Sequence, residues 1–293
     1  MSTPPPDVPL ESSEPDGCGQ LHPKESPELI KRKLQEFHEF VKEMPQDETA
    51  GVHQAQDKCP DQLDDDFKLM FLRAEVFHVD LAAKRYCKYW ERRIERFGPD
   101  KAFLPLTLDG AFKDDHVAIN LGFMQPLGTR EPNTGRPLIL VDPSHQDRSQ
   151  HTRESLCRSL WYMVHSVLKD DDVAQRKGVV LVVTGKTVKF GQFDRAQAKM
   201  NMESISGCLP LRISVAHMCH PPKFFAIVFA VMKLFLGDTV RKRIRVHSGS
   251  DKHVVKTLEK KFGLTKDVLP TELSGAIVVD HQGWVKKRQD AGL

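Results

Sequence analysis

The residues of this chain with types and spacing suited to chemistry are a few polar side chains beside apolar runs. Thr184-Gly185-Lys186-Thr187 follows the apolar run Val179–Val183 and resembles the end of a phosphate-binding loop. That loop requires a glycine five residues before Gly185, so that backbone amides can curl around phosphates, and position 180 is valine. No GxSxG or HExxH motif is present, and no GxGxxG follows a predicted strand. The sequence therefore favours neither a nucleotide site nor a nucleophile elbow.

Histidines and acids offer a second kind of chemistry. His145 and His151 share a polar stretch with Asp142 and Asp147, but they lack metal-ligand spacing on a common face, which favours a solvated loop. His217 lies in an apolar run and is typical of a hydrogen-bonded core histidine. No pattern assembles a nucleophile, a base and an orienting group. We predict no enzyme activity, no catalytic residue, no metal and no cofactor.

The cysteines and the first residues bear on the compartment. No two cysteines have CxxC spacing, which argues against a zinc site or a redox dithiol. The start MSTPPPDVPLESSEPDG has neither a basic region nor an apolar run of the secretory type. We expect reduced cysteines and a cytoplasmic protein that associates transiently with membranes. The six cysteines are Cys18, Cys59, Cys87, Cys157, Cys208 and Cys219.

The stretch from Pro222 to His247 is the most informative part of the chain. Phe224 to Met232 is unbroken apolar sequence, and four basic residues follow within positions 241–245. A helix here would be apolar nearly all round, and it is shorter than the ~20 apolar residues that span a bilayer. An apolar helix beside a cationic cluster is typical of a protein that handles lipid at an anionic surface. The overall net charge of +3 does not indicate general nucleic-acid binding.

The elements that must position these residues fall into three predicted regions. Residues 1–25 are rich in proline, serine and acid, which predicts a disordered tail. Residues 26–101 predict a small helical lobe, beginning at the cap Ser26-Pro27-Glu28, with a polar loop over 43–62. Two further helices are predicted over Asp64–Phe77 and from the cap Asp80 to Gly98.

Residues 102–285 alternate short apolar runs with helical patterns. This alternation predicts an α/β fold with a mostly parallel sheet flanked by helices. The predicted strands are Val117–Phe123, Pro137–Val141, Val179–Thr184, Arg212–Met218 and Ile244–His247. The predicted helices are Thr152–Lys169, Phe193–Ile205, Phe224–Leu236 and Asp251–Phe262.

Four segments in fixed order carry a family resemblance. They are FLRAEVFHVDLAAKRYCKYWERR, GRPLILVD, LPLRISVAHMCHPPKFFAIVFAVMKLFLGDTVRKRIRVHS and LPTELSG. Together they resemble the CRAL-TRIO lipid-binding family, in the branch of α-tocopherol transfer protein and cellular retinaldehyde-binding protein, over residues 64 to 280. The resemblance implies a bowl of parallel strands around an apolar cavity, closed by a mobile gate helix at Pro222–Leu236, behind a helical lobe.

The resemblance also implies site residues. Cavity and gate positions have the same residue types as plain core packing, and both interpretations stay open for each one. They are Phe224, Phe225, Val228, Phe229, Met232, Phe235, Ile213, Val215, Trp161 and Val164. A basic patch for phosphoinositide phosphates would include Arg212, Lys233, Arg241, Lys242, Arg243 and Arg245.

Several positions depart from the family pattern. Ser214, Thr239 and Glu75 stand where the tocopherol-transfer branch has basic residues, and Leu211 replaces the acid of the phosphatidylinositol-transfer branch. We predict a non-catalytic carrier of one hydrophobic molecule, with a basic patch for anionic membranes that contain phosphoinositides such as phosphatidylinositol bisphosphate. The alternatives are a phosphoinositide-binding recruitment adaptor without a cargo and an α/β enzyme of unrecognised chemistry.

Overall fold

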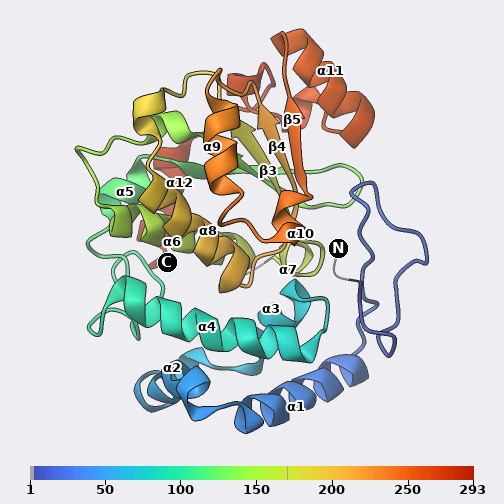
Figure 1. Ribbon diagram of the computed structural model, residues 1–293, viewed down its shortest axis with the longest axis vertical. Helices are drawn as coiled ribbons and strands as arrows, with labels where there is room; N and C mark the ends of the chain where they lie inside the picture. The colour runs from blue at the N-terminus through green and yellow to red at the C-terminus, as the bar shows by residue number, and fades with distance from the viewer. Residues whose placement is uncertain (1–2, 170) are drawn as a thin grey trace.

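A five-stranded sheet forms the centre of the structure, a computed structural model that describes residues 3–169 and 171–293 (Figure 1). The strands lie side by side in chain order. β1 and β2 are antiparallel, whereas β2 to β5 run parallel, so the predicted mostly parallel sheet is confirmed. The strands are β1 (Met124–Arg130), β2 (Pro137–Val141), β3 (Val179–Thr184), β4 (Ile213–Cys219) and β5 (Ile244–His247).

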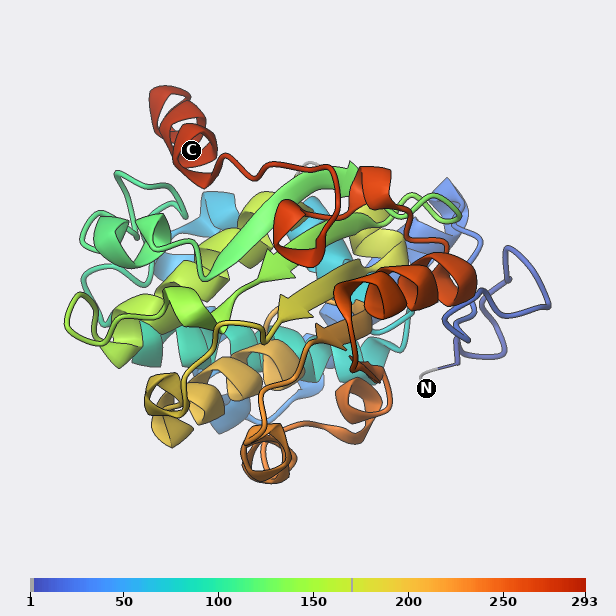
Figure 2. The same cartoon turned by 90° about the horizontal axis from the view of Figure 1, so that it is seen from above.

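Both faces of the sheet are covered by helices (Figure 2). In β3, Val180 and Val182 pack toward the cluster that contains α11, while Val179 and Leu181 pack toward the cluster that contains α6 and α8. This double burial explains why β3 is continuously apolar. The helices around the sheet are α5 (His116–Asn120), α6 (Arg153–Leu168), α7 (Asp172–Lys177), α8 (Arg195–Gly207), α9 (Phe225–Met232), α10 (Asp238–Arg241), α11 (Asp251–Phe262) and α12 (His281–Asp290). Short 3-10 turns occur at Pro60–Gln62, Pro143–His145, Phe190–Gln192, Lys266–Val268 and Thr271–Leu273.

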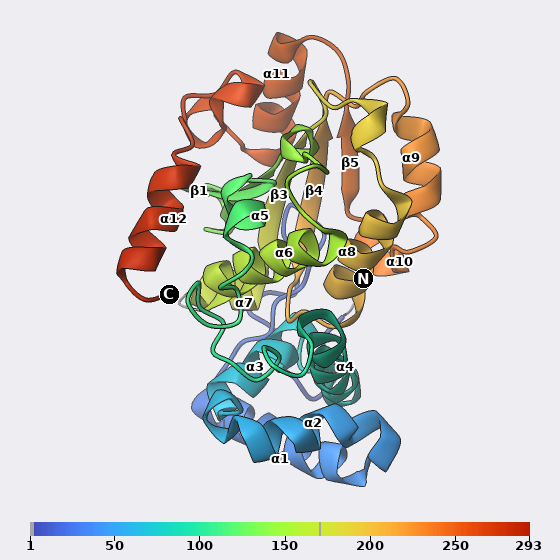
Figure 3. The ribbon, with the colours of Figure 1, turned by 90° about the vertical axis from the view of Figure 1, so that its left-hand side faces the viewer.

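Four helices form a lobe beside the sheet (Figure 3). The Ser26 side chain caps the first of them, as predicted, and Gly98 ends the fourth with a positive φ of 73°. The N-cap of the fourth helix is His78 rather than Asp80, and Asp80 lies in its first turn. The four are α1 (Pro27–Glu43), α2 (Gln46–Lys58), α3 (Asp65–Ala74) and α4 (Val79–Phe97).

The prediction of a loop over residues 43–62 was wrong, because this stretch contains α2. α2 has few apolar residues, so its helical period is faint in the sequence. Val52 is nevertheless buried, and Gly51 lies so close to α4 that an added Cβ would be 3.0 Å from the Glu91 amide nitrogen. Close packing on α4, and not local propensity, fixes this helix.

The predicted strand at Val117–Phe123 was also wrong. Residues 116–120 form α5, and the strand begins only at Met124. β1 carries Pro126, which a strand tolerates at the edge of a sheet, where a missing backbone donor leaves no partner unpaired. Because of that proline and Gly128, the β-propensity of this segment is low, and the strand could not be predicted from it.

Residues 3–25 pack against the domain instead of forming the disordered tail that we predicted. Val8 and Gln20 are buried, and Leu10 pairs with Pro23 in an antiparallel bridge. Composition missed this order because the stabilising contacts come from residues far along the chain; Gln20 Nε2 donates to the carbonyl of Ser214 at 2.9 Å.

Two helices near the end of the chain, α9 and α12, differ from the prediction. We predicted one helix over Phe224–Leu236, but α9 ends at Met232. Gly237, in an extended conformation, then precedes α10. α12, which we did not predict, places Arg288 within 2.7 Å of the Tyr162 hydroxyl. The predicted boundary near residue 101 stays a prediction, since one apolar cluster runs from the lobe into the sheet.

A buried ion pair ties the lobe to the sheet domain. Arg158 of α6 bonds both carboxylate oxygens of Asp115 at 2.7 Å, and its Nη1 donates to the Arg96 carbonyl at the end of α4. Asp115 is 1% exposed. One guanidinium therefore fixes α4, α5 and α6 relative to each other.

We predict that Asp115→Asn lowers the free energy of unfolding by about 3 kcal/mol, because it leaves the largely buried Arg158 without its counter-charge. Chemical denaturation monitored by circular dichroism measures this. Asp114→Asn is the matched control, since the neighbouring acid is exposed and pairs only with Lys101 at the surface, so its stability should change little. Equal effects of the two substitutions would contradict the linking role of Arg158.

Candidate functional site

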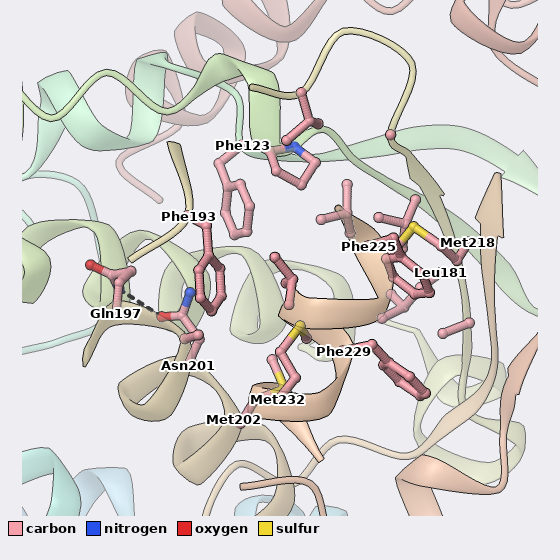
Figure 4. A pocket seen from close by; sticks show the side chains of 18 of the residues that line it. Phe123, Leu181, Phe193, Gln197, Asn201, Met202, Met218, Phe225, Phe229 and Met232 are labelled. Atoms are coloured by element: carbon pink, nitrogen blue, oxygen red, sulfur yellow. Dashed lines mark hydrogen bonds between the residues drawn. The ribbon is translucent and has the colours of Figure 1, made fainter. Parts of the chain in front are cut away.

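An apolar cavity lies between the sheet and α9 (Figure 4). Its volume is about 230 Å³. β3 and β4 form its floor, α8 forms one side, and α9 with the preceding loop forms the cover. The wall includes Phe123, Leu181, Phe193, Met202, Met218, Phe225, Phe229 and Met232. Such a site suits an apolar molecule and offers almost nothing to a charged one.

The sequence of α9 explains how it can cover the cavity and still face outward. Pro221 and Pro222 stop the chain from continuing as a strand, and the helix that follows has only apolar residues. None of its eight residues is fully buried. Phe225 and Phe229 line the cavity with their rings stacked 5.3 Å apart, while Ile227 on the outer side is 62% exposed.

Six predicted cavity residues line the wall, and their contact with a ligand stays a prediction. The six are Phe224, Phe225, Val228, Phe229, Met232 and Ile213.

The other four predicted cavity residues lie elsewhere in the structure. Val215 points to the opposite face of the sheet, toward α11, because side chains alternate along a strand. Trp161 and Val164 are fully buried in the cluster around α6, beneath the cavity wall rather than on it. Phe235 follows the end of α9 and is absent from the wall. The sequence shows that these residues are apolar, but it does not show in which direction their side chains point.

We missed the contribution of α8 to the wall. Its sequence RAQAKMNMESISG has a polar composition, yet Gln197, Asn201, Met202 and Ile205 face the cavity. Met202 and Ile205, three residues apart on one helical face, are the only signal that could have revealed it. Gln197 Nε2 donates to Asn201 Oδ1 at 2.9 Å, and Gln197 Oε1 has no partner within the described residues. That amide oxygen can accept a hydrogen bond from a ligand hydroxyl.

One acid, Asp194, stands at the cavity edge and is committed to structure. Burial raises its pKa, but amide hydrogen bonds from Gln197 and Ala196 and the bond from Arg153 at 2.8 Å outweigh burial and leave the pKa below its usual value. Asp194 caps α8 in this ionised form. It is therefore unsuited to act as a proton donor in the cavity.

The predicted basic patch divides into exposed and buried members. Lys233, Arg241 and Lys242 are exposed beside α9 and α10, whereas Arg245 is exposed on β5 in register with His217, whose side lies away from the cavity. Arg241 pairs with Asp238, whereas the Lys233 ammonium lies 4.7 Å from the Phe229 ring centre. Lys233, Arg241 and Lys242 form a charged surface next to the cover of the cavity.

Arg212 and Arg243 are 4% and 7% exposed and do not belong to that surface. Arg212 donates to the carbonyls of Arg176 and Leu21, and Arg243 donates to the carbonyl of Ile213. The prediction that they share a basic patch with Lys233, Arg241, Lys242 and Arg245 was wrong, because both side chains are buried and donate to backbone carbonyls. The nearby Ser214 hydroxyl donates to the Lys177 carbonyl, and the Glu75 carboxylate pairs with Arg85. The side chain of Thr239 lies outside the described part of the chain.

The other candidate groups do not assemble a reaction centre. Lys186 pairs with Asp251 at 2.8 Å. His217 bonds His247 at 2.9 Å, and burial, the neighbouring His247 and Arg245 lower its pKa to about 3, so it stays neutral. Across residues 3–169 and 171–293 no group of three metal-ligating side chains converges, and no helix has the length and apolar character needed to cross a bilayer. All six cysteines are free.

Comparison with known proteins identifies relatives of this fold and sequence. The sequence profile of the CRAL/TRIO domain matches residues 127–275. Clavesin-2 of Rattus norvegicus is 24% identical over 275 residues, which cover 92% of this chain and 77% of that protein. Alpha-tocopherol transfer protein-like of Mus musculus is 28% identical over 266 residues, 89% of this chain and 70% of that one. The crystal structure of Sfh5 superposes with a TM-score of 0.55 at 14% identity, covering 92% of this chain and 99% of the other.

We predict that Gly185→Ala loosens the cover of the cavity. A Cβ at this position would lie 2.7 Å from the His220 carbonyl oxygen and 2.8 Å from Cδ of Pro222, so the loop before α9 must move. The expected cost is about 1–3 kcal/mol of stability, with faster amide hydrogen exchange in α9. Gly191→Ala is the control, because nothing lies within 4 Å of its added Cβ. Unchanged exchange in α9 of Gly185→Ala would refute this coupling.

Proposed function

This chain belongs to the CRAL/TRIO domain family of lipid-binding and lipid-transfer proteins, and we propose that it carries one hydrophobic molecule without catalysing a reaction. The observation that supports this most is the apolar cavity beneath α9, a helix that is apolar on its outer side as well. Plain core packing would need only the inner side to be apolar.

The cargo that suits the cavity is a mainly apolar molecule with one polar end. Apolar burial supplies roughly 25 cal/mol per Å² of surface removed from water, so the hydrocarbon part provides most of the affinity. The free Oε1 of Gln197 would accept one hydrogen bond from a hydroxyl and so orient the cargo. Sterol-like, retinoid-like and tocopherol-like molecules share this chemistry.

α9 is suited to act as the gate. Its N-cap Phe224 provides no side-chain hydrogen bond, and no residue of the helix is fully buried, so few contacts oppose its opening. Gly237 at one end and His220 at the other, with a positive φ of 51°, flank the moving segment. When α9 swings outward, the cargo can leave without any unfolding of the sheet.

The surface around α9 suits the interface of an anionic membrane. Ile227 is 62% exposed and Leu234 is 69% exposed, beside the cations Lys233, Arg241 and Lys242. Apolar side chains that enter the headgroup boundary and cations that attract anionic lipids would act together. We propose transient binding from the cytoplasm to membranes that contain phosphoinositides.

A second candidate is a phosphoinositide-binding recruitment adaptor that transports no cargo. The observation in its favour is the same exposed surface, which would bind anionic lipid whether or not the cavity is loaded. An extractable ligand in purified protein separates the two functions.

We predict that Ala216→Phe abolishes cargo loading. Ala216 lies on β4 in the cavity wall, so an aromatic ring there would occupy the space proposed for the cargo. Native mass spectrometry after incubation with lipid vesicles should give the loaded complex for the unaltered chain and the empty mass for the variant. Ala276→Phe adds the same ring at an exposed position as the control. Full occupancy in Ala216→Phe, with its circular dichroism unchanged, would refute the cavity as the cargo site.

We predict that replacing Lys233, Arg241 and Lys242 together with Gln weakens binding to anionic vesicles by about a hundredfold. Each cation near such a surface is worth about 1 kcal/mol, and all three are exposed. Vesicle sedimentation measures the effect, and loading with cargo should be unchanged. The control replaces Lys31, Lys42 and Lys84, three exposed lysines of the helical lobe. An equal loss of vesicle binding in the control would mean that net charge, and not the surface beside α9, determines the binding.

A further inference from the structure

Three ionisable side chains meet at the carboxyl ends of the parallel strands. Lys186 follows β3, His220 follows β4, and Asp251 follows β5 in the first turn of α11. The carboxyl ends of neighbouring parallel strands lie at one edge of a sheet, so residues far apart along the chain come together there. Figure 3 shows α9 and α11 on opposite sides of the sheet, and this edge is where the segments that lead into them begin.

The Asp251 carboxylate connects these segments. Its Oδ2 accepts hydrogen bonds from Lys186 Nζ at 2.8 Å and from Ser274 Oγ at 3.0 Å. Its Oδ1 lies 3.3 Å from Nε2 of His220. The hydrogen bonds from Lys186 and Ser274 lower the pKa of Asp251, so this carboxylate is ionised at neutral and mildly acidic pH. A fixed negative charge therefore lies beside the ring of His220.

His220 is the last anchored residue before the loop that leads into α9. Its backbone amide donates to the His247 carbonyl of β5 at 3.0 Å, and Pro221 and Pro222 follow it. The side chain of His220 is 11% exposed. Its Nε2 makes no aligned hydrogen bond among the described residues, so its contact with Asp251 is electrostatic. The strength of that contact depends on whether the imidazole carries a second proton.

The charged and titratable groups around His220 come from several elements. Asp251 of α11 faces its ring, and Lys223, on the same segment as His220, is exposed. His247 of β5 contacts His220 through its carbonyl, and burial lowers the pKa of the His247 ring, which favours its neutral form. Lys186 bonds Oδ2 of Asp251, whereas His220 lies beside Oδ1. A proton on His220 therefore adds an attraction to Asp251 without displacing Lys186.

We propose that Asp251 and His220 form a proton-dependent latch that positions the hinge of the gate helix α9. This inference rests on the proposed function, in which α9 opens to exchange the cargo. Histidine changes its charge between about pH 5 and 8, and a protonated His220 is held more tightly by the ionised Asp251. The latch is therefore stronger at acidic pH and weaker at neutral pH, so α9 opens more often as the pH rises. Neither residue touches the cargo.

The test measures amide hydrogen exchange of residues 224–232 in the full chain without cargo. It compares about pH 5.5 with about pH 7.5, where histidine is mostly charged and mostly neutral, after correction for the intrinsic pH dependence of exchange. Opening should be about threefold more frequent at the higher pH, the usual effect of one partly exposed ion pair. His220→Asn stays neutral and tolerates the positive φ of this position, so its opening should not depend on pH. Equal opening of the unaltered chain at both pH values, or pH-dependent opening of His220→Asn, overturns the proposal.

Further variants test the assignment to this pair. His253→Asn removes an exposed histidine from the first turn of α11 and should keep the pH dependence. Asp251→Asn should lose the pH dependence and open more often at both pH values. Asp47→Asn removes an exposed acid from the first turn of α2 and should behave like the unaltered chain. Loss of the pH dependence in His253→Asn or Asp47→Asn, or its persistence in Asp251→Asn, contradicts the latch.

The latch and the carrier function can fail separately. The exchange comparison needs no cargo, whereas loading is measured by native mass spectrometry after incubation with lipid vesicles. A chain that loads lipid but opens equally at both pH values contradicts the latch alone. A chain that opens in a pH-dependent way but never loads lipid supports the latch and contradicts the carrier function.

Discussion

The apolar face of β3 and β4 that looks toward α9 is the constraint on which the rest of the structure depends. This face must be kept from water, yet the helix above it does not fill the space beneath. α6 and α8 seal the face from one side and the loop before α9 seals it from the other. An interior of this kind is stable only if its surroundings are rigid, because unfilled apolar volume forfeits contact energy. The buried pair of Arg158 and Asp115 and the aromatic packing of the lobe provide that rigidity.

The two sides of the sheet have opposite chemical character. The α9 side holds an apolar cavity, whereas the α11 side holds a polar one beside Arg136. Charge is also divided, since Lys233 and Lys242 reach solvent beside α9 while Arg212 and Arg243 are buried. The chain thus has an exposed cationic surface beside α9 and buried arginines elsewhere.

Much of this architecture could be predicted from particular residues. The continuous run of β3 indicated a strand covered on both faces, and Ser26 and Gly98 marked helix ends that the structure confirms. The predictions failed where local signals were weak or shared by two structures. α2 lacks apolar periodicity, β1 contains Pro126, and α8 has a polar composition although it lines the cavity. Trp161 and Phe225 are equally apolar, so composition could not tell the core from the cavity wall.

The sequence by itself determined the types and order of the elements, the all-round apolar character of α9 and the family, because these follow from residues close together along the chain. Only the tertiary structure decided which arginines are exposed, which apolar side chains face empty space, and that residues 3–25 are bound to the domain. Arg212 and Arg245 look alike in sequence, yet one is covered by Leu21, almost two hundred residues away, and the other is open to solvent. Burial and charge pairing depend on such distant contacts, and no local period records them.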